Sequence, residues 1–279
     1  MPAVSKHEER RFWKDLCKLF NQLIEDVKSG GGILNGMSPE YRKFMQSDRV
    51  KEYLNRVIGR MVRTQRKVSA NSWREAAYKS SSGPELYKLI SGEMKGPVGN
   101  RVWQIISENA AYIRTLPEEW ARFASQYAYR ETLKGRRPED VEAEMRKIIP
   151  SHMVKNLRCI ARTECAKANA AIVQARAEAC GIRCYIWRCV KDERSRDAHA
   201  AMDGILVFYD DPPNPEALFP SKGTRAYGNY HAGNTFNCRC YQESVVDIDF
   251  LPDVIRVHDH GRIVTMTRLQ IEKKYGKIA

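Results

Sequence analysis

Residues 156–190, NLRCIARTECAKANAAIVQARAEAC followed by GIRCYIWRCV, indicate the fold of this chain most clearly. Residues 156–180 are rich in alanine and other strong helix formers, and Gly181 stands where a glycine C-cap would end a helix. From residue 182 the apolar side chains alternate, as in a β-strand whose two faces are both largely covered. A long helix that leads directly into a strand indicates an α+β module.

The residues that follow extend this module. Residues 194–204 (RSRDAHAAMDG) are typical of a short helix, and residues 205–209 (ILVFY) are typical of a second strand. Residues 210–234 form a long loop rich in Pro, Gly and Asn, and a third strand is expected to begin near Cys238.

The predicted fold class is therefore α+β, with a mainly helical N-terminal region followed by a small module in which a long helix packs on a short antiparallel sheet. The predicted domains are a helical arm or docking region at 1–150, the α+β module at 151–250 and a C-terminal tail at 251–279. His258 and His260 are interpreted as exposed residues of that tail.

The N-terminal region reads as a series of helices. Apolar residues recur at three- and four-residue spacing over residues 7–28, which predicts an amphipathic helix. Ser38 before Pro39 is typical of an N-cap, and further helix starts are expected at prolines 84, 117 and 138. These segments contain no catalytic grouping, so we interpret the region as an arm that docks on a partner.

Composition limits the class of protein. The chain has 279 residues, 43% of them hydrophobic, which is enough to bury a sizeable core. It lacks a run of about 18 apolar residues that could cross a bilayer, and it is charged from Lys6 onward, unlike a secretory signal. We therefore expect a protein made in a cytoplasm, without membrane contact. Its eight cysteines should be reduced there and serve packing, metal binding or chemistry.

A net charge of +13 indicates an anionic neighbour. Residues 1–150 hold 28 Lys and Arg against 19 Asp and Glu. Within them Arg56, Arg60, Arg63 and Lys67 share one helix face, which could contact the phosphates of double-stranded DNA. A solvated helix surface explains the same spacing and is slightly favoured, because aromatic residues are not interleaved with the basic ones.

Three separated motifs resemble those of one protein family. ARTECAKANAA (161–171), GIRCYIWRCVKDERSRDAHAAMDG (181–204) and FNCRCY (236–241) are similar in order and spacing to phage Mu F-like minor head proteins, over roughly residues 150–245. The resemblance implies a structural protein of head morphogenesis in the virion, inside the head near the portal vertex. Its implied partners are the portal protein, the major capsid or scaffold protein and packaged DNA. The resemblance does not imply catalysis.

One group of residues has the chemistry of a metal site. His199, His231, Cys238 and Cys240 would give Zn²⁺ four ligands and leave no net charge. The alternative is that both thiols pack in the core, where cysteine is common. The Cys-x-Cys spacing is one residue shorter than the usual structural pair, which favours packing without a cofactor.

A second group consists of charged residues. Its members are Arg162, Glu164, Asp192, Arg194, Arg196 and Asp203, with His199 among them. One hypothesis is a metal-dependent nuclease that uses His199 and His231, with His199 as general base. The other, which we favour, is an ion-pair network that fixes the long helix against the strand and loop, because no metal-ligand or nucleophile signature accompanies the group. The sequence thus predicts a protein that is not an enzyme.

Overall fold

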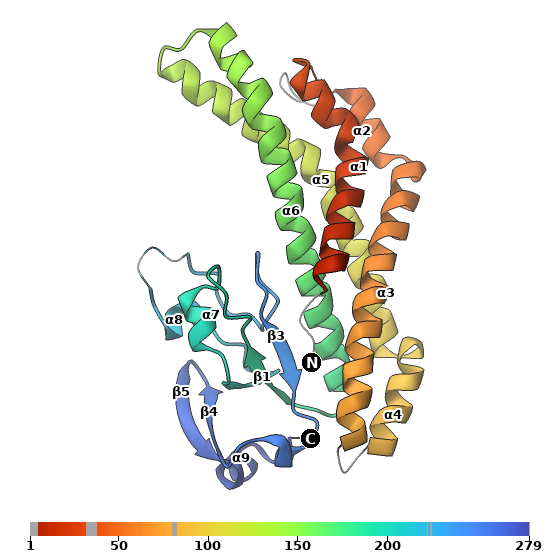
Figure 1. Ribbon diagram of the computed structural model, residues 1–279, viewed down its shortest axis with the longest axis vertical. Coiled ribbons are helices and arrows are strands. Elements are labelled where there is room, and N and C mark those ends of the chain that lie inside the picture. The colour runs from red at the N-terminus through yellow and green to blue at the C-terminus, as the bar shows by residue number, and fades with distance from the viewer. Residues whose placement is uncertain (1–4, 32–37, 80–82, 222, 224, 279) are drawn as a thin grey trace. The chain divides into compact units, whose positions relative to one another are not determined.

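The computed structural model describes residues 5–31, 38–79, 83–221, 223 and 225–278 (Figure 1). Its chain divides into two compact units, one made of Met1–Lys6, Val62–Gln104 and Arg162–Ala279 and the other of His7–Met61 and Ile105–Ala161. This division differs from the predicted boundary at residue 150, because three long helices each contribute to both units. The helices are α1 (Lys6–Lys28), α2 (Pro39–Gln46), α3 (Asp48–Lys79), α4 (Gly83–Gly92), α5 (Pro97–Leu133), α6 (Pro138–Ala179), α7 (Asp197–Ala201), α8 (Pro215–Leu218) and α9 (Arg268–Tyr275), with 3₁₀ turns η2 (Glu93–Lys95) and η3 (Ile248–Phe250).

The unit made of residues 7–61 and 105–161 is wholly helical among its described residues, as the spacing of apolar residues in the N-terminal sequence predicts. Helix α1 spans almost the predicted range and buries one apolar face, and Ser38 caps α2 by accepting a hydrogen bond from the Tyr41 amide. Phe20 of α1 meets Trp120 of α5 edge to face at 4.9 Å between ring centroids. The indole N–H of Trp120 donates to Asn156 of α6 at 3.0 Å, which ties the buried aromatic pair to a third helix.

Two prolines lie inside helices, against the sequence prediction. Helix α5 continues through Pro117, where a helix start was expected. Helix α6 begins at Pro138, as expected, but it continues through Pro150 and includes the segment from residue 156 that was expected to be a separate helix. A helix tolerates an internal proline when tertiary packing outweighs the lost hydrogen bond. Here Leu116 and Trp120 flank Pro117 on the buried face.

The other unit contains one five-stranded sheet. Its strands are β1 (Cys184–Arg188), β2 (Leu206–Phe208), β3 (Tyr241–Ser244), β4 (Val254–Asp259) and β5 (Arg262–Thr267), in the order β3-β1-β2-β4-β5 (Figure 1). The fold is α+β as predicted, but the sheet is mixed and not wholly antiparallel, because β4 runs parallel to β2. Between β2 and β4 the chain forms β3, which pairs with β1 on the side away from β2.

Each face of the sheet is covered by a separate apolar cluster. Cys184 and Ile186 of β1 face one cluster, while Tyr185 and Trp187 face the other, as the alternation at residues 182–190 predicts. The second cluster also contains Cys238 and Cys240, and it therefore lies beside the residues of interest for function.

Residues 251–279, predicted to be a tail, contribute two strands and a helix to this sheet. Ile255 and Val257 of β4 and Ile271 of α9 are buried in the first apolar cluster. His258 is buried, with Nδ1 3.1 Å from Asp211, whereas His260 is exposed and pairs with Asp259. The interpretation of residues 251–279 as a tail was wrong. Strand β4 pairs with β5 in a hairpin and also pairs in parallel with β2, and this second pairing joins segments far apart in the sequence, which local patterns do not predict.

The carboxyl end of α6 is held in this unit by a buried ion pair. Arg176 donates to both carboxylate oxygens of Glu93, at 2.7 and 3.1 Å, and to Ser69 at 2.6 Å. Arg66 adds a further hydrogen bond to Glu93 at 2.8 Å. Helix α6 ends at Ala179, and Gly181 just beyond it has φ +72°. The Ile182 amide donates to the Ala177 carbonyl, as the predicted glycine C-cap requires.

Among the helices that the structure describes, none is long and apolar enough to cross a membrane.

Candidate metal centre

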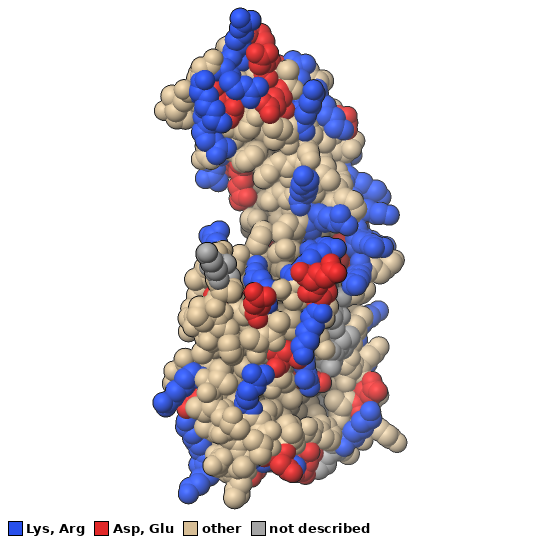
Figure 2. Space-filling model, turned by 60° about the vertical axis from the view of Figure 1, so that its left-hand side comes forward, with Lys and Arg blue, Asp and Glu red and all other residues tan. Residues whose placement is uncertain are grey.

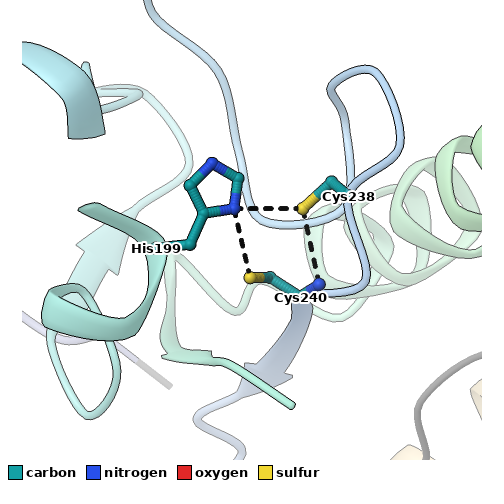
Figure 3. Close-up of side chains that lie close together, drawn as sticks. All are labelled: His199, Cys238 and Cys240. Carbon is teal, nitrogen blue, oxygen red and sulfur yellow. Dashed lines mark hydrogen bonds between the residues drawn. The ribbon is translucent and has the colours of Figure 1, made fainter. Parts of the chain in front are cut away.

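The candidate site is formed by helix α7 and the segment that precedes β3. His199 lies on α7, while Cys238 and Cys240 lie on the irregular segment that ends where β3 begins at Tyr241 (Figure 3). The third strand was predicted to begin near Cys238, so that the pleat would align the two thiols. Instead a turn aligns them, in which Asn237 takes the left-handed conformation with φ +54°.

Helix α6 positions this turn. The Asn237 amide donates to Thr163 Oγ1 at 2.9 Å, and Arg162 donates to the Asn237 side chain at 3.0 Å. A neighbouring residue of the same segment, Gly233, has φ +84° and lies so close to α6 that an added Cβ would be 3.3 Å from the Ala170 methyl and 3.0 Å from the Cys240 carbonyl. The small residues of α6 therefore let the cysteine-bearing loop pack directly on the helix.

Three side chains converge on one point. The ligand atoms of His199, Cys238 and Cys240 lie within 4.8 Å of one another, and the residues are only 3%, 2% and 5% exposed. His199 Nδ1 is 3.5 Å from each sulfur (Figure 3). The Cys240 amide also donates to Cys238 Sγ at 3.4 Å. An amide directed at a sulfur stabilises the thiolate form, which is the form that binds metals.

The opposite nitrogen of His199 belongs to a buried hydrogen-bond chain. Nε2 is 2.8 Å from the Tyr230 hydroxyl, and that hydroxyl donates to Glu216 at 2.6 Å. Because the Tyr230 proton is committed to Glu216, the Tyr230 oxygen can accept a proton from Nε2, and this 2.8 Å contact is much shorter than the 3.4 Å contact between Nε2 and Arg196. This assignment of hydrogens leaves a lone pair on Nδ1, directed at the two sulfurs.

A fourth side chain, Cys189, lies beside this group. Its thiol forms a hydrogen bond with Cys240, and this bond, more than any other influence, lowers the pKa of Cys189 to about 6. Its amide donates to Asp203 at 2.8 Å, which fixes the backbone just after β1. Cys189, His199, Cys238 and Cys240 together line a cavity of about 50 Å³. Sequence reasoning did not include Cys189 in the candidate site, although the β1 alternation places it on the same face as Tyr185 and Trp187.

The coupled thiols of Cys238 and Cys240 share their charge unequally. The hydrogen bond from Cys240 is the main cause that holds the pKa of Cys238 well below its usual range, and His199 lowers it further. The hydrogen bonds that Cys240 forms with Cys189 and Cys238 are the main causes that raise the pKa of Cys240 well above its usual range.

His231, the fourth ligand in the sequence prediction, is not a member of the group. Its Nδ1 lies 3.2 Å from the Tyr185 hydroxyl, and its ring packs edge-on against Tyr185 and Tyr209. Burial lowers the pKa of His231 to about 4, so the ring is neutral at physiological pH. The two histidines of the nuclease hypothesis therefore lie in different surroundings: His199 faces two thiols, and His231 faces two tyrosines.

Within the described part of the chain, five of the six charged residues predicted to form one network have side chains that contact partners outside that set, and the sixth, Arg194, donates only its backbone amide, to Asp192 at 3.2 Å. Arg239 forms a two-pronged ion pair with Asp192, and Lys191 pairs with Asp203 at 2.7 Å. Lys167 pairs with Glu164 at 3.5 Å on the helix itself. Arg196 stacks on Tyr227 at 4.7 Å and donates to the Phe236 carbonyl at 2.8 Å, Arg162 holds Asn237, and Arg194 is exposed beside the cavity.

The predicted basic face of α3 is only partly exposed. Arg56, Arg63 and Lys67 are exposed to solvent. Arg60 instead turns toward α1, where it forms ion pairs with Glu8 and Asp15. Its charge is therefore neutralised within the helical unit, and phosphate contacts on this helix would rest on the other three residues.

Comparison with known proteins gives one family. Residues 127–243 match the family model described as Phage Mu protein F like protein, which confirms the resemblance of the sequence motifs. A Haemophilus influenzae protein described only as an uncharacterized protein is 27% identical over 209 residues, which cover 74% of this chain and 42% of that protein. This chain thus spans less than half of that relative's length. No solved structure matches the present chain.

Proposed function

Because residues 127–243 form a Mu F-like module, which suggests a protein of phage head morphogenesis, we propose that this protein is a structural minor capsid protein. It acts inside the head near the portal vertex. The family match carries this proposal, since it runs from α5 through the candidate centre into β3.

The geometry of the module supports a structural role. Arg162, Asp192 and Asp203 are all committed to holding loops: Arg162 binds the Asn237 turn, Asp192 binds Arg239, and Asp203 binds the Cys189 amide. A hydrolytic metal centre needs carboxylates free to bind the ion and a histidine free to accept a proton. His199 faces two sulfurs and Tyr230, so its surroundings suit support of the fold better than catalysis.

The proposed partners are the portal protein and the major capsid or scaffold protein, bound by the N-terminal helices, and packaged double-stranded DNA. The charge of the protein supports a DNA contact: the net charge is +13, and Lys and Arg side chains are spread over much of the face in Figure 2, with acidic side chains interspersed. Arg63 and Lys67 are exposed cations on α3 that could meet phosphates.

The test is the location of the polypeptide in intact particles of the phage that encodes it. Heads and tails are separated, and the protein is quantified in each by mass spectrometry and localised by cryo-electron microscopy of particles with and without the gene. We expect a few copies per head, with density at the portal vertex. Absence from purified heads would refute the proposal. Nuclease activity of the purified protein that is lost in His199→Gln, in a variant that still folds, would revive the enzymatic alternative.

A further inference from the structure

We propose that Cys189, His199, Cys238 and Cys240 bind one zinc ion, which fastens β1, α7 and the loop before β3 to one another. This centre would be structural. The inference does not depend on the role in head morphogenesis, because it rests on the convergence of His199, Cys238 and Cys240 and on the place of Cys189 in the lining of the same cavity.

The spacing of the converging atoms suits a tetrahedral ion. Zinc binds thiolate sulfur at about 2.3 Å and imidazole nitrogen at about 2.0–2.1 Å, so a sulfur and a nitrogen on the same tetrahedral ion lie about 3.5 Å apart. His199 Nδ1 lies 3.5 Å from Cys238 Sγ and 3.5 Å from Cys240 Sγ. A single lone pair on Nδ1 can accept only one thiol proton well, whereas one ion between the three atoms would satisfy all of them.

The surroundings of His199 match those of a metal ligand. Zinc-bound histidines almost always direct the second ring nitrogen to a carboxylate, carbonyl or water, which fixes the ring and its tautomer. Here Nε2 is directed at Tyr230, which is itself bonded to the buried carboxylate of Glu216. That chain points the Nδ1 lone pair at the sulfurs before any ion binds.

The choice of Cys189 over His231 as the fourth ligand follows from position. Cys189 lines the same small cavity as the other three residues and its thiol is hydrogen-bonded to that of Cys240, whereas His231 is enclosed by Tyr185 and Tyr209. The sulfur of Cys189 is outside the group whose ligand atoms all lie within 4.8 Å of one another, so coordination requires that it move closer to them. Three thiolates and a neutral imidazole leave one negative charge around Zn²⁺. Arg194 and Arg196 line the same cavity and offset that charge.

The unusual Cys-x-Cys spacing is accommodated by the backbone. With Asn237 at φ +54°, the chain turns so that both sulfurs face α7, and the Cys240 amide supports Cys238 Sγ. All four ligands come from the protein and the cavity is only about 50 Å³, which leaves no open coordination position for a substrate. Closed four-ligand sites of this kind stabilise folds and do not catalyse reactions.

The test begins with the full chain purified under reducing conditions without chelator. Its metal content is measured by mass spectrometry, and the protein is then stripped and titrated with Co²⁺, whose visible spectrum reports tetrahedral thiolate coordination. We expect about one zinc per chain and a tetrahedral Co²⁺ spectrum. Loss of an outer-shell partner alone typically weakens metal binding about 10–100-fold, so Cys189→Ser should weaken it by about 100-fold or more.

Two matched variants identify the ligands. His231→Gln should retain the metal and the Co²⁺ spectrum, and so should Cys184→Ser, a buried cysteine outside the cavity. Alkylation followed by peptide mapping provides a second readout, in which zinc should protect Cys189, Cys238 and Cys240 and chelation should expose them. Zinc-free protein that gives no tetrahedral spectrum would overturn the proposal. So would equal loss in His231→Gln and Cys189→Ser, or a Cys189–Cys240 disulfide in place of the ion.

Discussion

Arg176 and Glu93, 83 positions apart in the chain, form an ion pair in which both side chains are buried, at 1% and 3% exposure. The guanidinium makes two hydrogen bonds to the carboxylate, a third to Ser69, and lies 5.6 Å from the Trp73 ring centroid. This arrangement joins α6 to α3 and to the η2 turn. Neither residue was singled out by the sequence.

Removing one partner of this pair should be far more costly than removing both. Arg176→Met leaves the carboxylate of Glu93 buried with only Arg66 to neutralise it, so we expect a loss of about 3 kcal/mol in the free energy of unfolding, near the lower end for buried pairs. The double variant Arg176→Met, Glu93→Leu should recover part of this loss. Urea denaturation of both single variants and the double variant measures the coupling.

An exposed ion pair provides the control. Glu25→Gln breaks a pair with Lys28 in which both side chains are about half exposed, and it should cost less than about 1 kcal/mol. Additive effects of the Arg176 and Glu93 substitutions would contradict the buried pairing.

Gly233→Ala should loosen the cysteine-bearing loop. The residue has φ +84°, and a Cβ there would meet the Cys240 carbonyl at 3.0 Å and the Ala170 methyl at 3.3 Å. Gly228 has nearly the same φ, +80°, but nothing within 4 Å of an added Cβ. Gly228→Ala should therefore cost about 1 kcal/mol through backbone conformation alone, and Gly233→Ala about 1–3 kcal/mol more through overpacking. Thermal melting of both variants checks the difference, and equal melting temperatures would show that the loop does not lie against α6.

The sequence located this loop and its helix but not the contacts between them. Local signals were sufficient for the helix that Gly181 ends, the two faces of β1 and the short helix of His199, because propensity, capping and alternation act over a few residues. They were sufficient to bring His199, Cys238 and Cys240 together as candidates. The resemblance of the motifs to the Mu F-like family was confirmed over residues 127–243.

What the sequence could not supply depends on packing between distant segments. Taken alone, Pro117 is typical of a helix start. Helix α5 continues through it because Leu116 and Trp120, on either side, are both buried in the tertiary packing. The partner of Asp192 is Arg239, 47 positions away, and no local rule selects it over the nearer arginines. Cys189 was assigned to a covered strand face, and it becomes a candidate ligand only when Cys240 is placed beside it.

Stability should fall at mildly acid pH partly because of His231. Burial, the main cause, lowers the pKa of this residue from its usual 6.5 to about 4. Between these two values the unfolded chain binds a proton that the folded chain does not, so the free energy of unfolding decreases as pH falls from about 6.5 to 4. His231→Gln should flatten this part of the pH profile relative to the unsubstituted protein. Chemical denaturation at several pH values gives the comparison, and parallel profiles would show that His231 is solvated.

DNA binding, if α3 contributes to it, should respond to Arg63 and Lys67 and not simply to net charge. Each phosphate contact adds about 0.9 to the slope of log K against log salt concentration, so Arg63→Gln with Lys67→Gln should reduce that slope by about 1.8. Arg10→Gln with Lys14→Gln removes the same charge at the same spacing from the exposed face of α1 and should leave the slope nearly unchanged. Arg60→Gln should act differently again, lowering stability with little effect on the slope, because Arg60 is paired with Glu8 and Asp15. Fluorescence anisotropy with a labelled duplex across a salt series measures all four proteins. Equal slope changes in the two double variants would assign binding to overall charge, and no binding at low salt would exclude DNA as a partner.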